Sequence, residues 1–255
     1  MCSIWKVIPG SMGLLGLEIV RRLEKETKTR AFLSIGGNPT TTVPILKSVR
    51  HFDDIGKMQQ FYCLAQKDEY QIAKISHYEP FVENNDYKVN VTPIANIEEL
   101  EKCYDLSQSE DSFPYKDCWY MNHRYFEHPI FKYQVLGLSE AGEQMQALMF
   151  CREQLCNGTK VLRIVDYIGN IKLFAGISGF LKSALNDYEY IDLYCYGVDN
   201  TPILQSGMIE RTNDDTNIIP NYFAPYVEKN IDIWVGTPKG KATFFKADGD
   251  QDRPN

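Results

Sequence analysis

Residues 4–26, "IWKVIPGSMGLLGLEIVRRLEKE", place a short apolar run directly before a turn with three glycines and an amphipathic helix. From Gly16 onward the apolar residues Ile19, Val20 and Leu23 recur at helical spacing, and charged residues occupy the opposite face. Glycines at a strand-to-helix turn let backbone N–H groups approach an anion, and the helix N-terminus adds partial positive charge. The glycine spacing matches neither the dinucleotide fingerprint nor the nucleotide P-loop. The turn is therefore either an anion cradle or a structural corner.

The charge balance and the cysteine usage disfavour several classes of protein. The chain of 255 residues carries 27 Lys and Arg against 34 Asp and Glu, a formal charge of -7, which disfavours a nucleic acid or an anionic membrane as partner. It contains neither a run of about 18 apolar residues nor a signal-peptide pattern, so we expect no membrane span and a cytoplasmic protein. The seven cysteines lack Cys-x-x-Cys spacing, which favours reduced thiols and predicts no metal site.

Periodicity predicts the order β-α-β-α-β-β for the first eighty residues. The predicted strands are residues 3–8, 31–37, 57–66 and 70–75, and the predicted helices are residues 16–26 and 43–49, the second capped by Asn38 or Thr40. The polar, proline-bearing segment 76–88 breaks both periodicities. It predicts a boundary between a domain of residues 1–80 and a second domain of residues 81–255.

The second part of the chain also reads as mixed α/β. Its predicted strands are residues 87–94, 131–138, 146–155, 160–169, 190–197 and 231–236, and its predicted helices are residues 96–106, with Asn96 as cap, and 173–185. Helices that alternate with strands in this way predict a mixed sheet with helices packed on it.

The order of elements resembles a known family of acyltransferases. A strand, a glycine-rich turn, an amphipathic helix, a second strand and an Asn-led helix are similar to the acetyl-CoA-binding half of the GNAT fold. The whole chain resembles tandem GNAT-type N-acetyltransferases that act on nucleotide-linked amino sugars in bacterial surface-polysaccharide pathways. The segments that carry the resemblance are residues 5–24, 34–46, 125–133, 161–170, 218–230 and 246–255.

The resemblance implies an α/β (α+β) fold with two GNAT-like mixed-sheet domains in tandem. The first domain lacks the N-terminal strands expected of such a unit, which predicts a truncated fragment. The uncovered strand edge predicts pairing with a second copy or with another protein.

The resemblance also implies where acetyl-CoA binds. The glycine turn would hold the pyrophosphate through main-chain N–H groups, and the strand before it would hold the pantetheine arm. The implied coenzyme-binding residues are Val7, Ile8, Ser11, Met12, Gly13, Leu14, Leu15, Gly16 and Asn38. Gly10 stands where the family has Arg or Gln, and Ile45 or Leu46 stands where it has a proton-donating tyrosine, so Tyr62 or solvent would serve instead.

The acceptor side is predicted in the second domain. Asp166 and His128 are the candidate proton acceptors. The competing interpretations are a turn cap or a plain Arg163–Asp166 pair for Asp166, and a hydrogen-bonded residue at a strand entrance for His128. The predicted substrate-binding residues are Arg163, Tyr167, Asn221, Tyr222, Asp248, Asp250, Asp252 and Arg253. The aspartates of the tail lack the glycine of a calcium loop, so the alternatives are a disordered acidic tail and a docked tail that offers carboxylates to an amino sugar.

The resemblance thus implies transfer of an acetyl group from acetyl-CoA to the amine of a nucleotide-linked amino sugar. Two alternatives stay open. One is a catalytically silent GNAT-like binding or scaffold protein of the same pathway, and the other is an aminoacyl or longer-chain acyl transferase.

Overall fold

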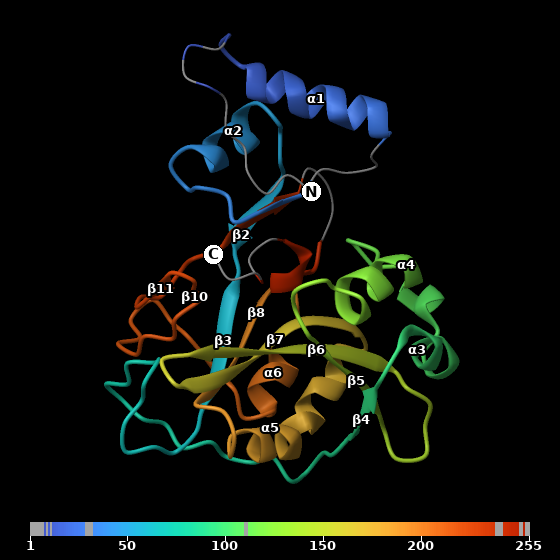
Figure 1. Ribbon diagram of the computed structural model, residues 1–255, viewed down its shortest axis with the longest axis vertical. Helices are drawn as coiled ribbons and strands as arrows, with labels where there is room; N and C mark the ends of the chain where they lie inside the picture. Colours follow the sequence, from blue (N-terminus) through green and yellow to red (C-terminus); the bar gives the residue numbers. More distant parts are fainter. Residues whose placement is uncertain are drawn as a thin grey trace.

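A mixed eight-stranded sheet forms the centre of the molecule (Figure 1). The computed structural model describes residues 8, 10, 12–28, 33–109, 112–237, 242–249 and 252. The sheet has the order β4-β5-β6-β7-β8-β3-β9, and β13 pairs with β8. Among the described strands of this sheet β7 and β8 run parallel, and the other neighbours run antiparallel. The strands are β3 (Gln59–Leu64), β4 (Asn90–Ile94), β5 (Gln134–Ser139), β6 (Ala147–Cys156), β7 (Thr159–Gly169), β8 (Tyr190–Tyr196), β9 (Ile209–Glu210) and β13 (Phe244–Phe245).

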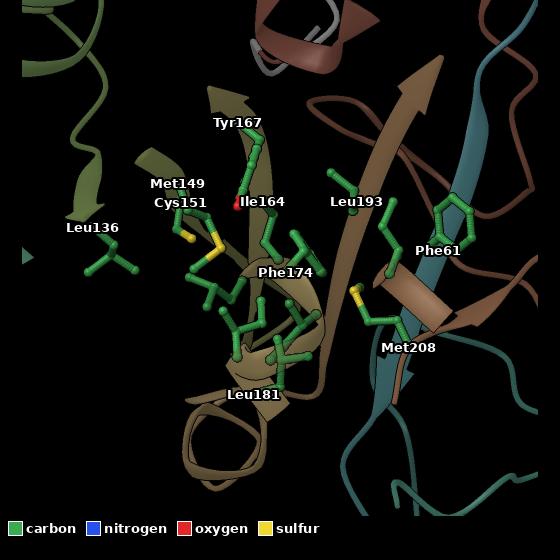
Figure 2. Packing of buried hydrophobic residues seen from close by; sticks show 14 of the residues in the cluster. Phe61, Leu136, Met149, Cys151, Ile164, Tyr167, Phe174, Leu181, Leu193 and Met208 are labelled. Atoms are coloured by element: carbon green, nitrogen blue, oxygen red, sulfur yellow. The ribbon is translucent and has the colours of Figure 1, made fainter. Parts of the chain in front are cut away.

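Helices cover both faces of this sheet. Because side chains alternate along β6, Met149 and Cys151 belong to one core cluster while Leu148 and Phe150 belong to another. The helices of the first face are the 3₁₀ helix η3 (Ile171–Ile177), α5 (Ser178–Ala184) and α6 (Thr201–Gln205), and those of the second are α3 (Ile97–Cys103), the 3₁₀ turn η1 (Leu106–Ser109), α4 (Cys118–Met121) and the π-helical turn η2 (Asn122–Phe126). Figure 2 shows the first cluster, in which Phe174 of η3 and Leu181 of α5 pack together with Ile164 of β7 and Leu193 of β8.

A smaller sheet joins segments from the two ends of the chain. Strand β12 (Trp234–Thr237) lies between β1 (Ser34–Ile35) and β2 (Asp54–Lys57) and pairs antiparallel with both. Helices α1 (Leu15–Thr27) and α2 (Thr42–Ser48) lie at the same end of the molecule (Figure 1). The hairpin of β10 (Tyr222–Phe223) and β11 (Tyr226–Val227) and the 3₁₀ turn η4 (Lys246–Asp248) complete the described elements.

Most of the predicted elements of residues 81–255 are confirmed. The strands β4 to β8 and helix α3 form where they were predicted, and the Asn96 side chain caps α3 by accepting from the Glu99 N–H at 2.9 Å. The predicted helix 173–185 instead begins as the 3₁₀ helix η3 and becomes α-helical at Ser178.

The predicted strand 70–75 is wrong. In this segment the backbone N–H groups of Gln71, Ile72 and Ala73 donate to the Glu189 carboxylate at 2.7 to 2.8 Å. A buried carboxylate that accepts three main-chain donors satisfies them without a neighbouring strand, so only a single bridge at Lys74 is left among these residues.

The predicted domain boundary near residue 80 does not coincide with a break in either sheet. Strand β3 precedes it and pairs with β8 and β9, which follow it. Strand β12 likewise pairs with β1 and β2. No helix among the described residues is long and apolar enough to cross a membrane.

Candidate active-site crevice

The parallel strands β7 and β8 separate toward their carboxyl ends. Their register is limited to three pairs, the last of which joins Ile164 to Leu193. Beyond it β7 continues to Gly169 beside β6, while Cys195 and Tyr196 of β8 pair with β13. The C-terminal segment therefore enters the wedge between the two strands. Ligands of open α/β sheets bind at carboxyl ends where neighbouring strands diverge.

A β-bulge in β7 determines the face of the sheet on which the Asp166 side chain lies. The register with β6 shifts so that Phe150 opposes Asp166 and Cys151 opposes Ile164, which leaves Val165 as the extra residue. Such an insertion breaks the alternation of side chains and bends the strand. The Asp166 side chain consequently lies on the face of α4 and η2, where it contacts Lys116 and Tyr125.

A pocket of about 210 Å³ lies at the mouth of the wedge. Its walls come from the loop before α4, the carboxyl ends of β7 and β8, and the C-terminal segment. The lining residues are Ser109, Ser112, Phe113, Pro114, Lys116, Tyr167, Ile168, Gly169, Ile171, Gly197, Val198, Asp199, Thr243 and Phe245. We call this pocket the crevice.

A buried ion cluster supports the wall of the crevice. The ammonium group of Lys116 lies 2.5 Å from Oδ1 of Asp166 and 2.8 Å from Oδ1 of Asp248. Asp166 also accepts from the Tyr125 hydroxyl and from the Tyr167 N–H, and Asp248 accepts from the Phe245 N–H at 2.8 Å. Three elements distant in sequence thus meet at Lys116.

The charges of this cluster are not balanced, since it holds two carboxylates and one ammonium. Burial raises the pKa of Asp248 to about 6, against the attraction of Lys116. Burial acts to lower the pKa of Lys116, but the attraction of Asp166 and Asp248 outweighs it and the pKa lies above its ordinary value. Lys116 is therefore a cation at every physiological pH.

The side chains of Asp252 and Lys246 also fix the C-terminal segment. Asp252 is fully buried and accepts from Arg152 at 2.9 Å, from Arg124 at 3.0 Å and from the Tyr133 hydroxyl at 2.6 Å. Lys246 is also buried and donates to Asn221. The described aspartates of the tail, Asp248 and Asp252, are thus docked, and their carboxylates accept hydrogen bonds from protein groups. Their predicted contact with an amino sugar stays a prediction.

The predicted catalytic and substrate residues do not all converge on the crevice. Tyr167 lines it and Asp166 lies behind Lys116. His128 lies outside it, where its Nδ1 accepts from the N–H groups of Ile130 and Phe131, as expected of a residue at a strand entrance. Burial, followed by repulsion from the neighbouring Arg124, lowers its pKa.

The considered Arg163–Asp166 pair is wrong. Arg163 instead binds Asp192 of the neighbouring strand in a bidentate pair at 2.9 and 2.6 Å, and it also donates to Asn221. The side chains of Arg163, in β7, and Asn221 are buried, and Tyr222 in β10 is half-buried. None of the three lines the crevice. Asp250 and Arg253 lie outside the described residues.

The described residues of the glycine turn, 10 and 12–16, do not line the crevice. Every lining residue of the crevice follows residue 108. Ile8, Met12 and Leu14 are at least 70% exposed, and Leu15 and Gly16 form the first turn of α1. Gly13 lies within the same exposed turn, and a Cβ built there would meet no neighbour within 4 Å. Val7 and Ser11 lie outside the described residues.

Asn38, the remaining predicted coenzyme contact, stabilises the turn before α2. Its side-chain oxygen accepts from the N–H groups of Thr40 and Thr41 at 2.9 and 3.1 Å.

Several crevice residues were not predicted. Lys116 gives no sequence signal, because a single lysine in a loop is ordinary. Gly169 has a sequence signal, since Gly169 and Asn170 form a glycine turn between a predicted strand and a predicted helix. Gly197 and Asp199 follow the other strand in the same way.

A larger cavity of about 830 Å³ adjoins the crevice at Asp199. Its charged lining residues are Asp86, Glu140, Asp199 and Lys172, so three carboxylates face one ammonium group. Within the described ranges no group of three or more His, Cys, Asp or Glu side chains is arranged to hold a metal ion.

No protein-family model and no curated protein matches the chain. Among solved structures it is similar to a conserved protein of Enterococcus faecalis V583 described as a probable N-acyltransferase, with 10% identity and a TM-score of 0.50 over 80% of this chain and 49% of that one. The likeness shows the fold. A GCN5-related N-acetyltransferase of Anabaena variabilis ATCC 29413 is also similar, with 9% identity and a TM-score of 0.46 over 88% of this chain and 50% of that one. The chain thus spans about half the length of both proteins.

Proposed function

We propose that this chain transfers an acetyl group from acetyl-CoA to the amine of a nucleotide-linked amino sugar, with the reaction taking place in the crevice. The observation that carries the proposal is the separation of the parallel strands β7 and β8 around a pocket that Lys116 lines. The fold shared with a probable N-acyltransferase supports acyl transfer as the reaction class. The amino sugar and its polysaccharide pathway rest on the sequence resemblance.

The crevice fits the extended arm of the donor. Phe113, Ile168, Val198 and Phe245 give it apolar walls, which suit the aliphatic parts of such an arm. Acetyl-CoA supplies the acyl group as a thioester, so that a C–N bond to the neutral acceptor amine forms as the C–S bond breaks. The coenzyme A thiolate leaves, and the proton lost from the amine passes through solvent to the thiolate, which gives the free thiol.

Lys116 is the residue to which we assign charge stabilisation. An ammonium group has three N–H donors, and Asp166 and Asp248 accept two of them. The third is available to an oxygen that becomes negatively charged in the crevice. A fixed N–H donor directed at such an oxygen stabilises its charge, and the two carboxylates beside Lys116 reduce this stabilisation. Asp166 and Asp248 position Lys116 and keep it protonated.

A bulky side chain at Thr243 should block the crevice. Thr243 is exposed and lines the pocket, so a Thr243→Trp variant can fold while its indole fills the pocket mouth. We expect acetyl-CoA binding, measured by isothermal titration, to weaken at least about tenfold, because each lost apolar contact group costs on the order of 1 kcal/mol.

The matched control is Thr212→Trp, an exposed threonine that does not line the crevice. Equal binding by both variants would contradict the placement of the donor. If the unmodified chain neither binds acetyl-CoA nor releases thiol with any amino sugar, the scaffold alternative replaces the proposal.

The acidic lining of the larger cavity should weaken the binding of a phosphorylated donor. If the phosphates of acetyl-CoA leave the crevice on the side of Asp86 and Asp199, the double variant Asp86→Asn/Asp199→Asn removes two repulsive charges. We expect its Kd for acetyl-CoA to fall about two- to fivefold at low salt, and the difference to vanish at high salt. Asp187→Asn, an exposed site away from the cavity, should leave the Kd unchanged. An unchanged Kd in the double variant would place the phosphates elsewhere.

A further inference from the structure

A third cavity, of about 380 Å³, opens beside the crevice and shares Ser109, Ser112 and Gly169 with it. Its other lining residues are Tyr104, Gln108, Gln146 and Asn170. The volume lies within the range of small-molecule sites. Since the two cavities share lining residues, a ligand in this one lies next to the pocket that Lys116 lines.

The chemistry of this lining differs from that of its neighbours. Apart from Gly169, every residue carries an uncharged polar side chain, either a hydroxyl (Tyr104, Ser109 and Ser112) or a carboxamide (Gln108, Gln146 and Asn170). Such groups both donate and accept hydrogen bonds. They complement a neutral ligand that has many hydroxyl groups, whereas a phosphate or a cationic polyamine would find no opposite charge among the described residues of the lining.

One acceptor beside the cavity is unused. The side-chain oxygen of Gln146 is buried and has no hydrogen-bond partner. A buried polar atom of this kind costs free energy unless something donates to it. The side-chain oxygen of Asn170 already accepts from the Lys172 N–H at 3.1 Å. The NH₂ group of Asn170 is therefore the group that can donate to a ligand in the cavity.

The aromatic residue of the lining is not a stacking platform. The Tyr104 ring belongs to the buried core, and its hydroxyl lies 3.2 Å from that of Ser109. A flat nucleobase would therefore find hydroxyl edges rather than an open ring face.

We propose that this cavity holds the hydroxyl-bearing ring of the acyl acceptor, a neutral hexose ring, with the amine directed into the crevice. The Gln146 oxygen accepts from a ring hydroxyl, and Ser109, Ser112 and Asn170 contact the others. Any charged group of the acceptor lies outside this cavity. This inference rests on the proposed function for the identity of the reaction, but the binding of a hexose can be tested without it.

The test compares two ring amines, glucosamine and the hydroxyl-free cyclohexylamine, as acceptors with acetyl-CoA. In the Gln146→Leu variant we expect the KM for glucosamine to rise about tenfold, the usual cost of a lost buried hydrogen bond, while the KM for cyclohexylamine stays the same or falls. The control is Gln134→Leu, an exposed glutamine outside the cavity, which should change neither value. Equal changes for the two amines, or none, would overturn the inference.

A second measurement separates this inference from the proposed function. Titration of the chain with N-acetylglucosamine, without any donor, reports hexose binding alone. If no amine is acetylated but hexose binding weakens about tenfold in Gln146→Leu, the cavity assignment stands and the proposed reaction fails. If amines are acetylated but N-acetylglucosamine binds equally to both variants or to neither, the cavity assignment fails and the reaction stands.

Discussion

Replacement of Gly169 by alanine is expected to lower the proposed acyl transfer by about 100-fold or more and to lower the Tm by roughly 10 °C. Gly169 has a φ of +93°, which a residue with a Cβ rarely adopts. A Cβ there would also lie 2.5 Å from the Gln146 carbonyl oxygen and 2.7 Å from the Tyr104 hydroxyl. The backbone strain and the clash together cost about 3–4 kcal/mol.

The effect on activity follows from the position of Gly169. It lines both the crevice and the neighbouring uncharged cavity, so relief of the clash must move one wall of each. Displacement of a reacting group by about 1 Å costs on the order of 100-fold in rate.

Gly158→Ala is the matched control for this variant. Gly158 lies between β6 and β7 at their opposite end and has a φ of +77°, but a Cβ there would meet nothing within 4 Å. The Gly158→Ala variant therefore has the backbone strain without the clash. We expect it to lose less Tm than Gly169→Ala and to keep the activity of the unmodified chain. If thermal melts and thiol-release rates were the same for both variants, the close approach at Gly169 would have no importance for the site.

Local patterns predicted the elements of residues 81–255 well because each depends on neighbouring residues. The apolar runs of β6 and β7 and the cap at Asn96 are visible in the sequence itself. Segment 70–75 has an equally strand-like composition, but its donors are bound by Glu189, more than 110 residues later. Periodicity carries no information about such a partner.

The location of the crevice could not be read in the same way. The chain contains two strand–glycine–helix patterns, at residues 4–26 and 160–185, and they are similar as local signals. The second pattern has a parallel neighbour, β8, which separates from β7 after Leu193. That separation depends on the bulge at Val165 and on the insertion of β13, which are tertiary features.

Loss of the Lys116 charge is expected to be the most destabilising of the cluster variants. Lys116→Met leaves Asp166 and Asp248 buried without a cation, for which we expect a loss of about 3–5 kcal/mol in the free energy of unfolding at pH 8. Asp248→Asn instead leaves one ammonium facing one carboxylate, and its amide oxygen can still accept from the Phe245 N–H. We expect this variant to stay within about 1 kcal/mol of the unmodified chain at pH 8.

The pH dependence follows from the pKa of Asp248, which folding raises from 3.8 to about 6. Between these values the folded state binds more protons than the unfolded state, so the stability from this group is complete below pH 4 and is lost as the pH rises through 6. Asp248→Asn should remove that slope. The cost of Lys116→Met should be smaller at pH 5, where Asp248 can be neutral.

Urea unfolding at pH 5 and pH 8 measures the free energy of unfolding of both variants. Lys160→Met is the control, because the ion pair of Lys160 with Glu153 is exposed. Loss of this pair should change the free energy of unfolding little at either pH. The unequal charge count is the reason for the expected order, since removing an anion balances the cluster while removing the cation leaves it with two negative charges. If Asp248→Asn were as damaging as Lys116→Met at pH 8, both carboxylates would have to be needed to hold Lys116. The cluster would then act as a rigid scaffold for the crevice, and Lys116 would not act there as a donor to a ligand.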